Sequence, residues 1–434
     1  MTYSSAAEIT KKLITLPTVN PPGNELAAQE YLQALLEDGG FAVQRFTMTA
    51  DRPNLVTRLP GAGQRPPLLF YGHTDVVGVE GQQWDFPPFA AVESDGLLFG
   101  RGALDMKAGV AMLVHTLLRA KAENLRPAGD IILALVVDEE SGGAAGMQYL
   151  LSEHPVIFAG VEHAIGEFGG FPLYAFGRKF YRIGVSQKQY AHLQLRLHAP
   201  GGHGSLPARN TVLAKLGQAL VKLDQAAMPY HKTPLVEHII SLMADNVSPP
   251  DQEILRGLLD PETFAGSLAA IGPGQERFES LFRDTANPTI VRVGDKFNVI
   301  PSAVLVEIDA RILPGRTAAD VVAELQALLG DDVEIEILAA GPTTKPTVDY
   351  TLFDTLAAIL IELDPTGIPI PYLFNESPDG RLLEDAGMQN YGFLPMNLPP
   401  EIDLPSLIHG PNERVPLAAI QFGADALYEL LKRY

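Results

Sequence analysis

Two histidines and four acidic residues of this chain stand beside glycines or at the ends of apolar runs, where they could bind metal ions. His73 follows an apolar run near the start, and His409 precedes a Gly-Pro-Asn-Glu turn near the end. Between them lie the acidic residues Asp105, Glu139, Glu140 and Glu167. Imidazole and carboxylate are the ligands that zinc accepts when no thiolate is available. Because the chain has no cysteine, thiolate ligands, cysteine nucleophiles and disulfides are excluded.

Most of these residues come just after short apolar runs that predict buried strands. His73 lies two residues past the run 68–71, and the Glu139–Glu140 pair comes shortly after the run 131–137. Glu167 follows a short apolar piece in the same way. In open α/β sheets, ligands bind at the edge formed by the carboxyl ends of the strands. We therefore expect these side chains to meet at one edge of a sheet.

Asp105 has two interpretations. It stands at the start of a predicted helix over 106–123, whose apolar residues recur at helical spacing. Free backbone N–H groups at that position favour an anion, so an ordinary helix-capping role is the alternative to a metal ligand. The other candidate ligands favour the metal-binding interpretation.

Two local patterns would suit catalysis. Asp75, two residues after His73, could hold the far ring nitrogen of that histidine and fix its tautomer. Successive side chains of an extended chain point to opposite sides, so one carboxylate of the Glu139–Glu140 pair could bind metal while the other serves as a general base. The alternative is a solvated acidic turn, since Asp138 makes three acidic residues in a row. Seven further histidines lack ligand-like neighbours and are interpreted as structural: His115, His154, His163, His192, His198, His231 and His238.

The bulk composition limits the class of protein. A length of 434 residues suggests two or three domains. The net charge of −20 argues against nucleic acid or an anionic membrane surface as a partner. No signal peptide is visible, and the strongest apolar run is too short to span a bilayer. With the lack of cysteine, this predicts a cytoplasmic protein.

The pattern of polar and apolar residues changes along the chain. Strands and helices alternate up to about residue 182, which is typical of a largely parallel sheet covered by helices. Strict polar–apolar alternation then predicts half-exposed antiparallel strands over 191–199, 304–312 and 333–338. We interpret 225–290 as helical, and helical patterns return from 352 onward.

This organisation predicts an α/β fold with an insertion. Residues 1–182 and 342–434 would form a metal-binding catalytic domain with a mostly parallel central sheet, and residues 183–341 an inserted α+β domain. A phosphate-binding loop around Gly100 is disfavoured, because the spacing of a phosphate cradle and the Gly-Lys-Ser/Thr element are missing.

Five motifs follow one another along the chain: His-x-Asp at 73–75, Gly-Arg-Gly-x-x-Asp-Met-Lys at 100–107, Asp-Glu-Glu-x-Gly-Gly at 138–143, Gly-Glu at 166–167 and the late His409. Their order resembles the M20 family of zinc-dependent aminopeptidases, carboxypeptidases and aminoacylases. Further segments fit as well: Gly201 to Pro207, Asn298 to Pro301, and Asp309 to Arg311. The resemblance covers nearly the whole chain. It implies a zinc-peptidase-like catalytic domain with an inserted lid or dimerisation domain, and in the second case a homodimer through 183–341.

The resemblance also implies the role of each residue. Two Zn²⁺ ions would be held, with Co²⁺ and Mn²⁺ as alternatives that accept the same ligands. Asp105 would bridge them, Glu139 would be the general base and Asp75 would orient a ligand histidine. His203 would reach the substrate oxyanion, and Asn298 and Arg311 would hold the substrate. The metal ligands would be His73, Asp105, Glu140, Glu167 and His409. The peptide after Asp105 would be cis.

Two departures refine the assignment. Glu167 is followed by Phe168 where many members have proline, which is more like the branch of carboxypeptidase S and N-acyl-amino-acid hydrolases. The stretch from Ser377 to Arg381 replaces a usual Gly-Gly-Thr-Asp-like loop. We expect a metal-dependent hydrolase that cleaves an amide bond of a small peptide or N-acyl amino acid through a metal-activated water. The alternative is a catalytically inactive binding protein on the same fold.

Overall fold

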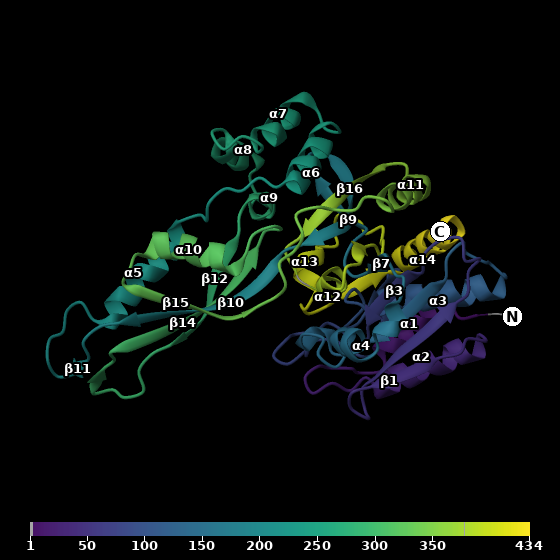
Figure 1. The fold of residues 1–434 in the computed structure, drawn as a ribbon, viewed down its shortest axis with the longest axis horizontal. Helices are drawn as coiled ribbons and strands as arrows, with labels where there is room; N and C mark the ends of the chain where they lie inside the picture. Colours follow the sequence, from purple (N-terminus) through teal and green to yellow (C-terminus); the bar gives the residue numbers. More distant parts are fainter. Residues whose placement is uncertain (1–2, 377) are drawn as a thin grey trace. The chain divides into compact units, whose positions relative to one another are not determined.

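The computed structural model describes residues 3–376 and 378–434, and Ser377 lies outside the described residues. The chain divides into two compact units. The first comprises Met1–Val185, Asp349–Tyr372 and Pro378–Tyr434, and the second comprises Ser186–Val348 and Leu373–Ser377. Figure 1 shows the first and last parts of the chain, in purple and yellow, side by side in the first unit.

A nine-stranded sheet is the centre of the first unit, with the strand order β1-β2-β6-β3-β7-β17-β9-β16 and β8 paired to β9. Strands β6, β3, β7 and β17 run parallel to one another, and antiparallel pairs flank them. The predicted α/β class with a largely parallel central sheet is thereby confirmed. The strands are β1 (Gln44–Thr47), β2 (Pro53–Leu59), β3 (Leu68–His73), β6 (Ile131–Val136), β7 (His163–Gly166), β8 (Phe171–Ala175), β9 (Arg178–Gln187), β16 (Gly367–Phe374) and β17 (Gln389–Gly392).

The central strands are apolar because both of their faces are covered. Every residue of β3 and β6 is buried, as expected for parallel strands between two layers of helices. Helix α3 is buried almost all round and packs against both α1 and α14. The helices of this unit are α1 (Ala6–Ile14), α2 (Leu26–Asp38), α3 (Lys107–Ala122), α4 (Met147–Glu153), α11 (Phe353–Leu363), α12 (Gly380–Asp385), α13 (Leu404–Leu407) and α14 (Leu417–Arg433), with 3₁₀ turns η1 (Glu139–Ser141) and η2 (Pro155–Phe158).

A small sheet joins two distant parts of the first unit. Its three strands, in the order β18-β5-β4, are β4 (Val92–Ser94), β5 (Leu97–Phe99) and β18 (Arg414–Pro416). Strand β18 pairs antiparallel with β5, and the N–H of Gly100 donates to the carbonyl of Glu413. The loop before β18 therefore lies beside the segment that leads into α3.

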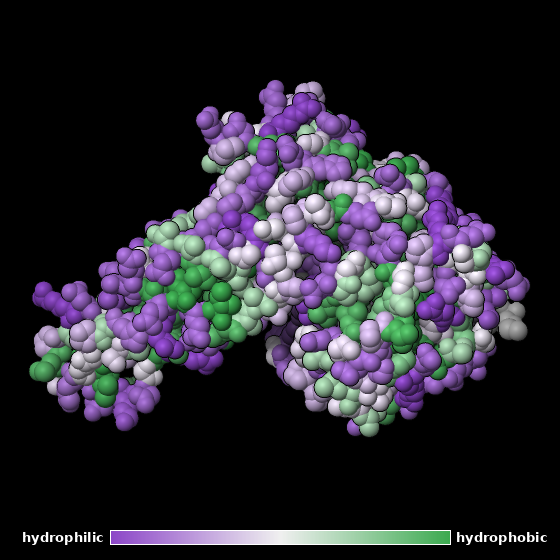
Figure 2. Space-filling model, viewed as in Figure 1, coloured by the Kyte–Doolittle hydropathy of each residue, from purple (hydrophilic) through white to green (hydrophobic). Residues whose placement is uncertain are grey.

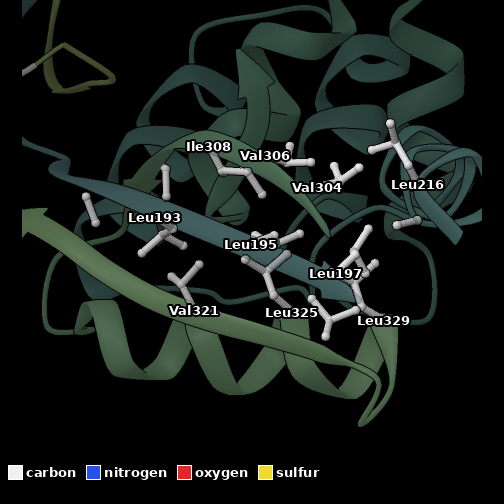
Figure 3. Close-up of a cluster of buried hydrophobic side chains, with 14 of the residues drawn as sticks. Leu193, Leu195, Leu197, Leu216, Val304, Val306, Ile308, Val321, Leu325 and Leu329 are labelled. Atoms are coloured by element: carbon white, nitrogen blue, oxygen red, sulfur yellow. The ribbon is translucent and has the colours of Figure 1, made fainter. Parts of the chain in front are cut away.

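The second unit is built on an antiparallel sheet in the order β12-β14-β10-β15. Alternate residues of β10 are buried, as the polar–apolar pattern predicts, and Leu195 lies opposite Val306 of β14. Helices α5 and α10 complete the core on the apolar face, as Figure 3 shows. The elements are β10 (Gln189–His198), β11 (Gly202–His203), β12 (Thr285–Arg292), β13 (Val299–Ile300), β14 (Ala303–Ile312), β15 (Val333–Ala340), α5 (Val212–Gln225) and α10 (Ala318–Leu329).

The segment 225–290 is helical only in part. It contains α6 (Pro234–Ala244), α7 (Pro249–Gly257), α8 (Phe264–Ile271) and α9 (Gln275–Phe282). The helical interpretation is wrong for its last residues, which begin β12. That strand contains Pro288 and a register shift, and it lies at the edge of its sheet. An edge strand can accommodate proline because one side of it has no ladder to complete.

Both edge strands of this sheet leave apolar side chains at the surface. Val291 of β12 and Leu338 of β15 are exposed, and Figure 2 shows an apolar patch over this sheet. Among residues 3–376 and 378–434, no helix is long and apolar enough to cross a membrane.

The core of the second unit provides a test of its packing. Leu195 is fully buried between the sheet and α10, so Leu195→Ala should lower the free energy of unfolding by about 2–5 kcal/mol. Leu213 of α5 is exposed, and Leu213→Ala should change it by less than about 0.5 kcal/mol. Urea unfolding of both variants measures the difference. Equal effects would show that Leu195 does not pack as described.

Candidate metal centre

Two overlapping groups of side chains in the first unit have the geometry of metal ligands. One consists of His73, Asp105 and Glu167, and the other of Asp105, Glu140 and His409. Within each group, one nitrogen or oxygen atom of every residue lies within 4.8 Å of the others. Asp105 belongs to both groups. The structure thus brings together five residues that are up to 336 positions apart in the sequence (409 − 73).

The first group is deeply buried. The Nε2 atom of His73 lies 3.2 Å from Oδ1 of Asp105 and 3.3 Å from Oε2 of Glu167. His73 is the last residue of β3 and Glu167 follows β7, and these two strands are parallel neighbours. The edge formed by their carboxyl ends therefore holds two of the three side chains, as expected from the sequence.

The second group uses the other oxygen of Asp105. The Nε2 atom of His409 lies 3.1 Å from Oδ2 of Asp105 and 3.2 Å from Oε2 of Glu140. Glu140 lies in η1, just past β6. Because the two carboxylate oxygens of Asp105 face different histidines, this one side chain is shared between both groups.

Asp105 does not cap α3. The N-cap position of that helix is Met106, and no side chain there bonds to the helix. The peptide between Asp105 and Met106 is cis, as the family resemblance implied, and so is the peptide after Glu167, which no pattern in the sequence indicated. The carboxylate of Asp105 faces the two histidines, as the distances above show, rather than the helix.

Asp75 connects the first histidine with the acidic turn. The Nδ1 atom of His73 lies 3.0 Å from the main-chain oxygen of Asp75 and 3.4 Å from its carboxylate. That carboxylate accepts hydrogen bonds from the backbone N–H groups of Glu139 and Glu140, at 3.3 and 3.1 Å. It also accepts one from the Asn20 amide at 2.8 Å. One buried side chain thus orients both the imidazole and the turn.

The acidic turn is not solvated. Asp138 is buried with a left-handed backbone, at φ 71°. Its carboxylate accepts from Asn20, from the N–H of Ala145 and from Arg52 at 2.9 Å. Arg52 also donates two hydrogen bonds to the buried Glu25. These bonds fix a strained backbone, which a solvated turn would not require.

Burial and close contacts shift the pKa values of the carboxylates and of His409 in this cluster. Burial raises the pKa of Glu167 to about 8. Burial and the charge of Glu167 raise the pKa of Glu139 well above its usual range. Hydrogen bonds to Asp105 and Glu140 raise the pKa of His409 to about 10. Burial opposes ionisation of Asp105, but hydrogen bonds from the two histidines hold its pKa below its usual range. Without a cation, the cluster therefore retains protons near neutral pH.

The donor atoms fit divalent cations. Two buried oxygens, Oε1 of Glu140 and Oε2 of Glu167, have no hydrogen bond of good geometry from any described residue, although Nε2 of His73 lies 3.3 Å from the second. A buried carboxylate oxygen without a partner is costly. Histidine nitrogens and carboxylate oxygens without thiolates suit zinc, cobalt or manganese, so a bound cation would satisfy these atoms.

The predicted oxyanion-stabilising residue His203 and the predicted substrate-binding residues Asn298 and Arg311 belong to the second unit. His203 lies on β11, where its Nδ1 is 2.7 Å from the hydroxyl of Ser205. The N–H of Gly204 donates to the carbonyl of Asn298. Arg311 lies on β14 and its Nε donates to Asp309 at 3.1 Å. The pairing of β11 with β13 therefore brings His203 close to Asn298, the residue before β13. Arg311 lies on the four-stranded sheet.

Several residues of the centre escaped the sequence analysis. Asn20, Arg52 and Glu413 each bond to the ligand-bearing loops, yet nothing in their local spacing marks them. His231 has no ligand-like neighbour along the chain, but in the structure it lies 2.9 Å from Glu324. Arg316 forms ion pairs with both Glu324 and Asp284. This cluster in the second unit is an ion-pair network, so the structural interpretation of His231 is retained.

Two histidines around a shared aspartate, one of them at the carboxyl edge of an α/β sheet and the other in the loop before β18, form an arrangement that suits a metal-dependent hydrolase. Residues 69–433 match the model of peptidase family M20/M25/M40, so the chain belongs to this family. The resemblance drawn from the motifs is thereby confirmed, as is the expected class of enzyme.

Similar proteins cover most of the chain. It is 29% identical to human N-fatty-acyl-amino acid synthase/hydrolase PM20D1, over 84% of this chain and 74% of that protein. It is 25% identical to the probable carboxypeptidase S-like 2 of Dictyostelium discoideum, over 84% of this chain and 71% of the relative. The fold matches an M20 family metallo-carboxypeptidase of Sulfolobus solfataricus with a TM-score of 0.68 at 17% identity, over 99% of both chains.

The raised pKa of His409 predicts how the metal-free protein responds to pH. Its pKa is about 10 in the folded chain against an ordinary 6.5, so the folded state binds the extra proton between these values. The resulting stabilisation is complete below pH 6.5 and is lost as the pH rises toward 10. With chelator present, the urea midpoint of the unchanged protein should fall between pH 6.5 and 10, and the fall should be smaller in His409→Ala. An equal fall in both proteins would contradict the assigned contacts of His409.

Proposed function

We propose that this hydrolase uses two Zn²⁺ ions to cleave the amide bond of an N-acyl amino acid or small peptide. The observation that carries the proposal is the position of Asp105, whose two oxygens lie 3.2 and 3.1 Å from His73 and His409. A carboxylate shared in this way suits a bridging ligand between two cations.

The five ligands divide naturally between two ions. His73 and Glu167 would hold one ion, His409 and Glu140 the other, and Asp105 both. When bound, two such cations lower the pKa of a water to about 7 and polarise a carbonyl. Zn²⁺, Co²⁺ and Mn²⁺ all accept these nitrogen and oxygen ligands, and zinc is the proposed one.

Glu139 is the proposed general base. Its carboxylate lies beside the cluster, with Oε2 4.0 Å from Nε2 of His73, and it belongs to neither ligand group. Its pKa is raised by burial and by Glu167, which suits a group that accepts a proton from the attacking water and passes it to the departing nitrogen. The Asp75 carboxylate holds the backbone N–H of Glu139 and would thereby keep the base in place.

The second unit would supply the substrate contacts. His203 would stabilise the oxyanion of the attacked carbonyl, and Asn298 would hold the substrate beside it. Arg311 would bind the carboxylate of an amino-acid product, because its planar fork donates two parallel hydrogen bonds. These assignments come from the family motifs and remain predictions.

The similarity to the human relative favours N-acyl amino acids within this substrate class. That relative is named an N-fatty-acyl-amino acid synthase/hydrolase, and Phe168 follows Glu167 where many family members have proline. An inactive binding protein on the same fold is the alternative, and the complete set of ligands and the placement of Glu139 argue against it.

We also infer a homodimer through 183–341 and retain the cytoplasmic location as a prediction. Support for the dimer comes from the edge strands β12 and β15, which leave Val291 and Leu338 exposed. An exposed apolar edge favours pairing with a second chain. The mass in solution measures the oligomeric state.

Replacing Glu139 tests the catalytic proposal. Glu139→Gln keeps the size of the side chain but removes the base, so kcat should fall by about a hundred- to ten-thousand-fold. Metal content should stay at two ions per chain. The exposed Glu153 offers a matched control, and Glu153→Gln should keep full activity. A panel of N-acyl amino acids and dipeptides with the zinc-loaded protein gives the rates. Normal turnover by Glu139→Gln would remove this residue from the role of base.

Replacing Arg311 tests the carboxylate-binding proposal. A hydrogen bond to a charged group contributes about 1.5–3 kcal/mol, so Arg311→Ala should raise KM roughly ten- to a hundredfold with a smaller effect on kcat. Arg292, which pairs with Glu307 on the neighbouring strand, provides the control Arg292→Ala with an unchanged KM. An unchanged KM in Arg311→Ala as well would exclude Arg311 from substrate binding.

A further inference from the structure

The two histidines of the centre differ in how they are held. His73 is buried at the end of a central strand, whereas the side chain of His409 is 51% exposed. His409 lies in the loop between α13 and β18 and has a left-handed backbone, at φ 61°. A loop position of this kind must be fixed by contacts other than packing in a core.

Two side chains hold the backbone of His409. The amide of Gln82 donates to the carbonyl of His409 at 2.8 Å, and Nη2 of Arg101 donates to the same oxygen at 3.2 Å. The two side chains also bond to each other, since Nη2 of Arg101 donates to Oε1 of Gln82 at 2.9 Å. The indole N–H of Trp84 also donates to Oε1 of Gln82, and its ring lies against the guanidinium of Arg101.

Arg101 is itself anchored to the segment that carries Asp105. Its Nη1 lies 2.7 Å from the carboxylate of Glu413, and both side chains are almost completely buried. Glu413 accepts further hydrogen bonds from the N–H groups of Gly102, Leu104 and Asp105, at 2.8, 2.6 and 3.1 Å. The chain of contacts thus runs from the backbone of Asp105 to the carbonyl of His409.

These contacts link the shared ligand to the exposed ligand without touching His73. We propose that Gln82, Arg101 and Glu413 form a brace that sets the position of His409 relative to Asp105 and so controls the affinity of the second cation site. The three are positioning residues, because they act through the backbone and none belongs to either ligand group. This inference rests on the proposed two-ion function.

The brace makes the two sites unequal in a testable way. His73 ends the central strand β3 and Glu167 follows β7, so loosening the brace leaves the first site intact. Without the brace, part of the free energy of cation binding would be used to order the His409 loop. The affinity of the second site for its cation would therefore fall. Gln82 is the best position to change, because it is partly exposed while Arg101 and Glu413 form a buried ion pair whose loss could unfold the protein.

The experiment is a Zn²⁺ titration of the full chain by equilibrium dialysis with chelator competition. Gln82→Met keeps the approximate volume of the side chain and removes its hydrogen bonds. The first equivalent should bind as in the unchanged protein, and the second should bind at least tenfold more weakly. The neighbouring Gln83 is exposed and takes no part in the brace, so Gln83→Ala should retain both affinities.

A second variant separates geometry from charge. Arg101→Lys keeps the positive charge beside Glu413 but loses the planar fork that reaches Gln82 and His409, and it too should weaken only the second equivalent. Unfolding temperatures in chelator should stay close to that of the unchanged protein for Gln82→Met.

Three outcomes would overturn the inference. An unchanged second affinity in Gln82→Met, or a parallel loss of both equivalents, would show that the brace does not position His409 selectively. In both cases the proposed function would stand, because the unchanged protein would still bind two ions. If the unchanged protein bound no Zn²⁺, the proposed function itself would fail and the inference with it.

Discussion

The centre depends on one buried carboxylate shared between two imidazoles. Asp105 is almost fully buried, and its two oxygens face His73 and His409. Burying an acidic group is unfavourable unless a partner compensates the charge, and here the carboxylates of Glu139, Glu140 and Glu167 crowd the same region. Partial protonation of Glu167 and the proton held by His409 offset this cost in the chain alone. Two divalent cations would offset it more completely, which is why the arrangement suits a metal centre better than a structural ion cluster.

The elements around Asp105 follow from this constraint. The parallel strands bring His73 and Glu167 to one edge, and the Asp75 carboxylate ties the Glu139–Glu140 turn to the same edge. The small sheet of β18 and β5 brings the C-terminal loop across the chain to the start of α3. Each ligand thus comes from a different segment, and a few buried polar contacts rather than a continuous element fix the distances between them.

Local patterns in the sequence predicted the parts that depend on local physics. Uniformly apolar runs identified β3 and β6, strict alternation identified β10 and β14, and helical spacing identified α3. The five ligands expected from the ordered motifs are the residues that the structure brings together in the two groups, and their role as ligands stays a prediction. The domain limits proposed from the sequence are 1–182 with 342–434 for one domain and 183–341 for the other. These limits stay predictions, and the two compact units are described separately from them.

Contacts between distant residues were beyond this reasoning. Arg101 and Glu413 are 312 positions apart, and although each stands in a motif, no local pattern pairs them, since a buried ion pair follows only from the assembled fold. His231 and Glu324 are paired for the same reason. Pro288 interrupts the strand pattern of β12, and the first residues of this edge strand were therefore interpreted as part of the helical segment 225–290. What escaped prediction is therefore mostly the polar framework around the ligands, not the ligands themselves.

The most direct test of the central claim is anomalous X-ray diffraction from crystals of the zinc-loaded protein at the zinc absorption edge. The account predicts two peaks about 3.5–4 Å apart, with one oxygen of Asp105 about 2.0–2.2 Å from each. A single peak, or two ions that leave Asp105 unbound, would contradict it.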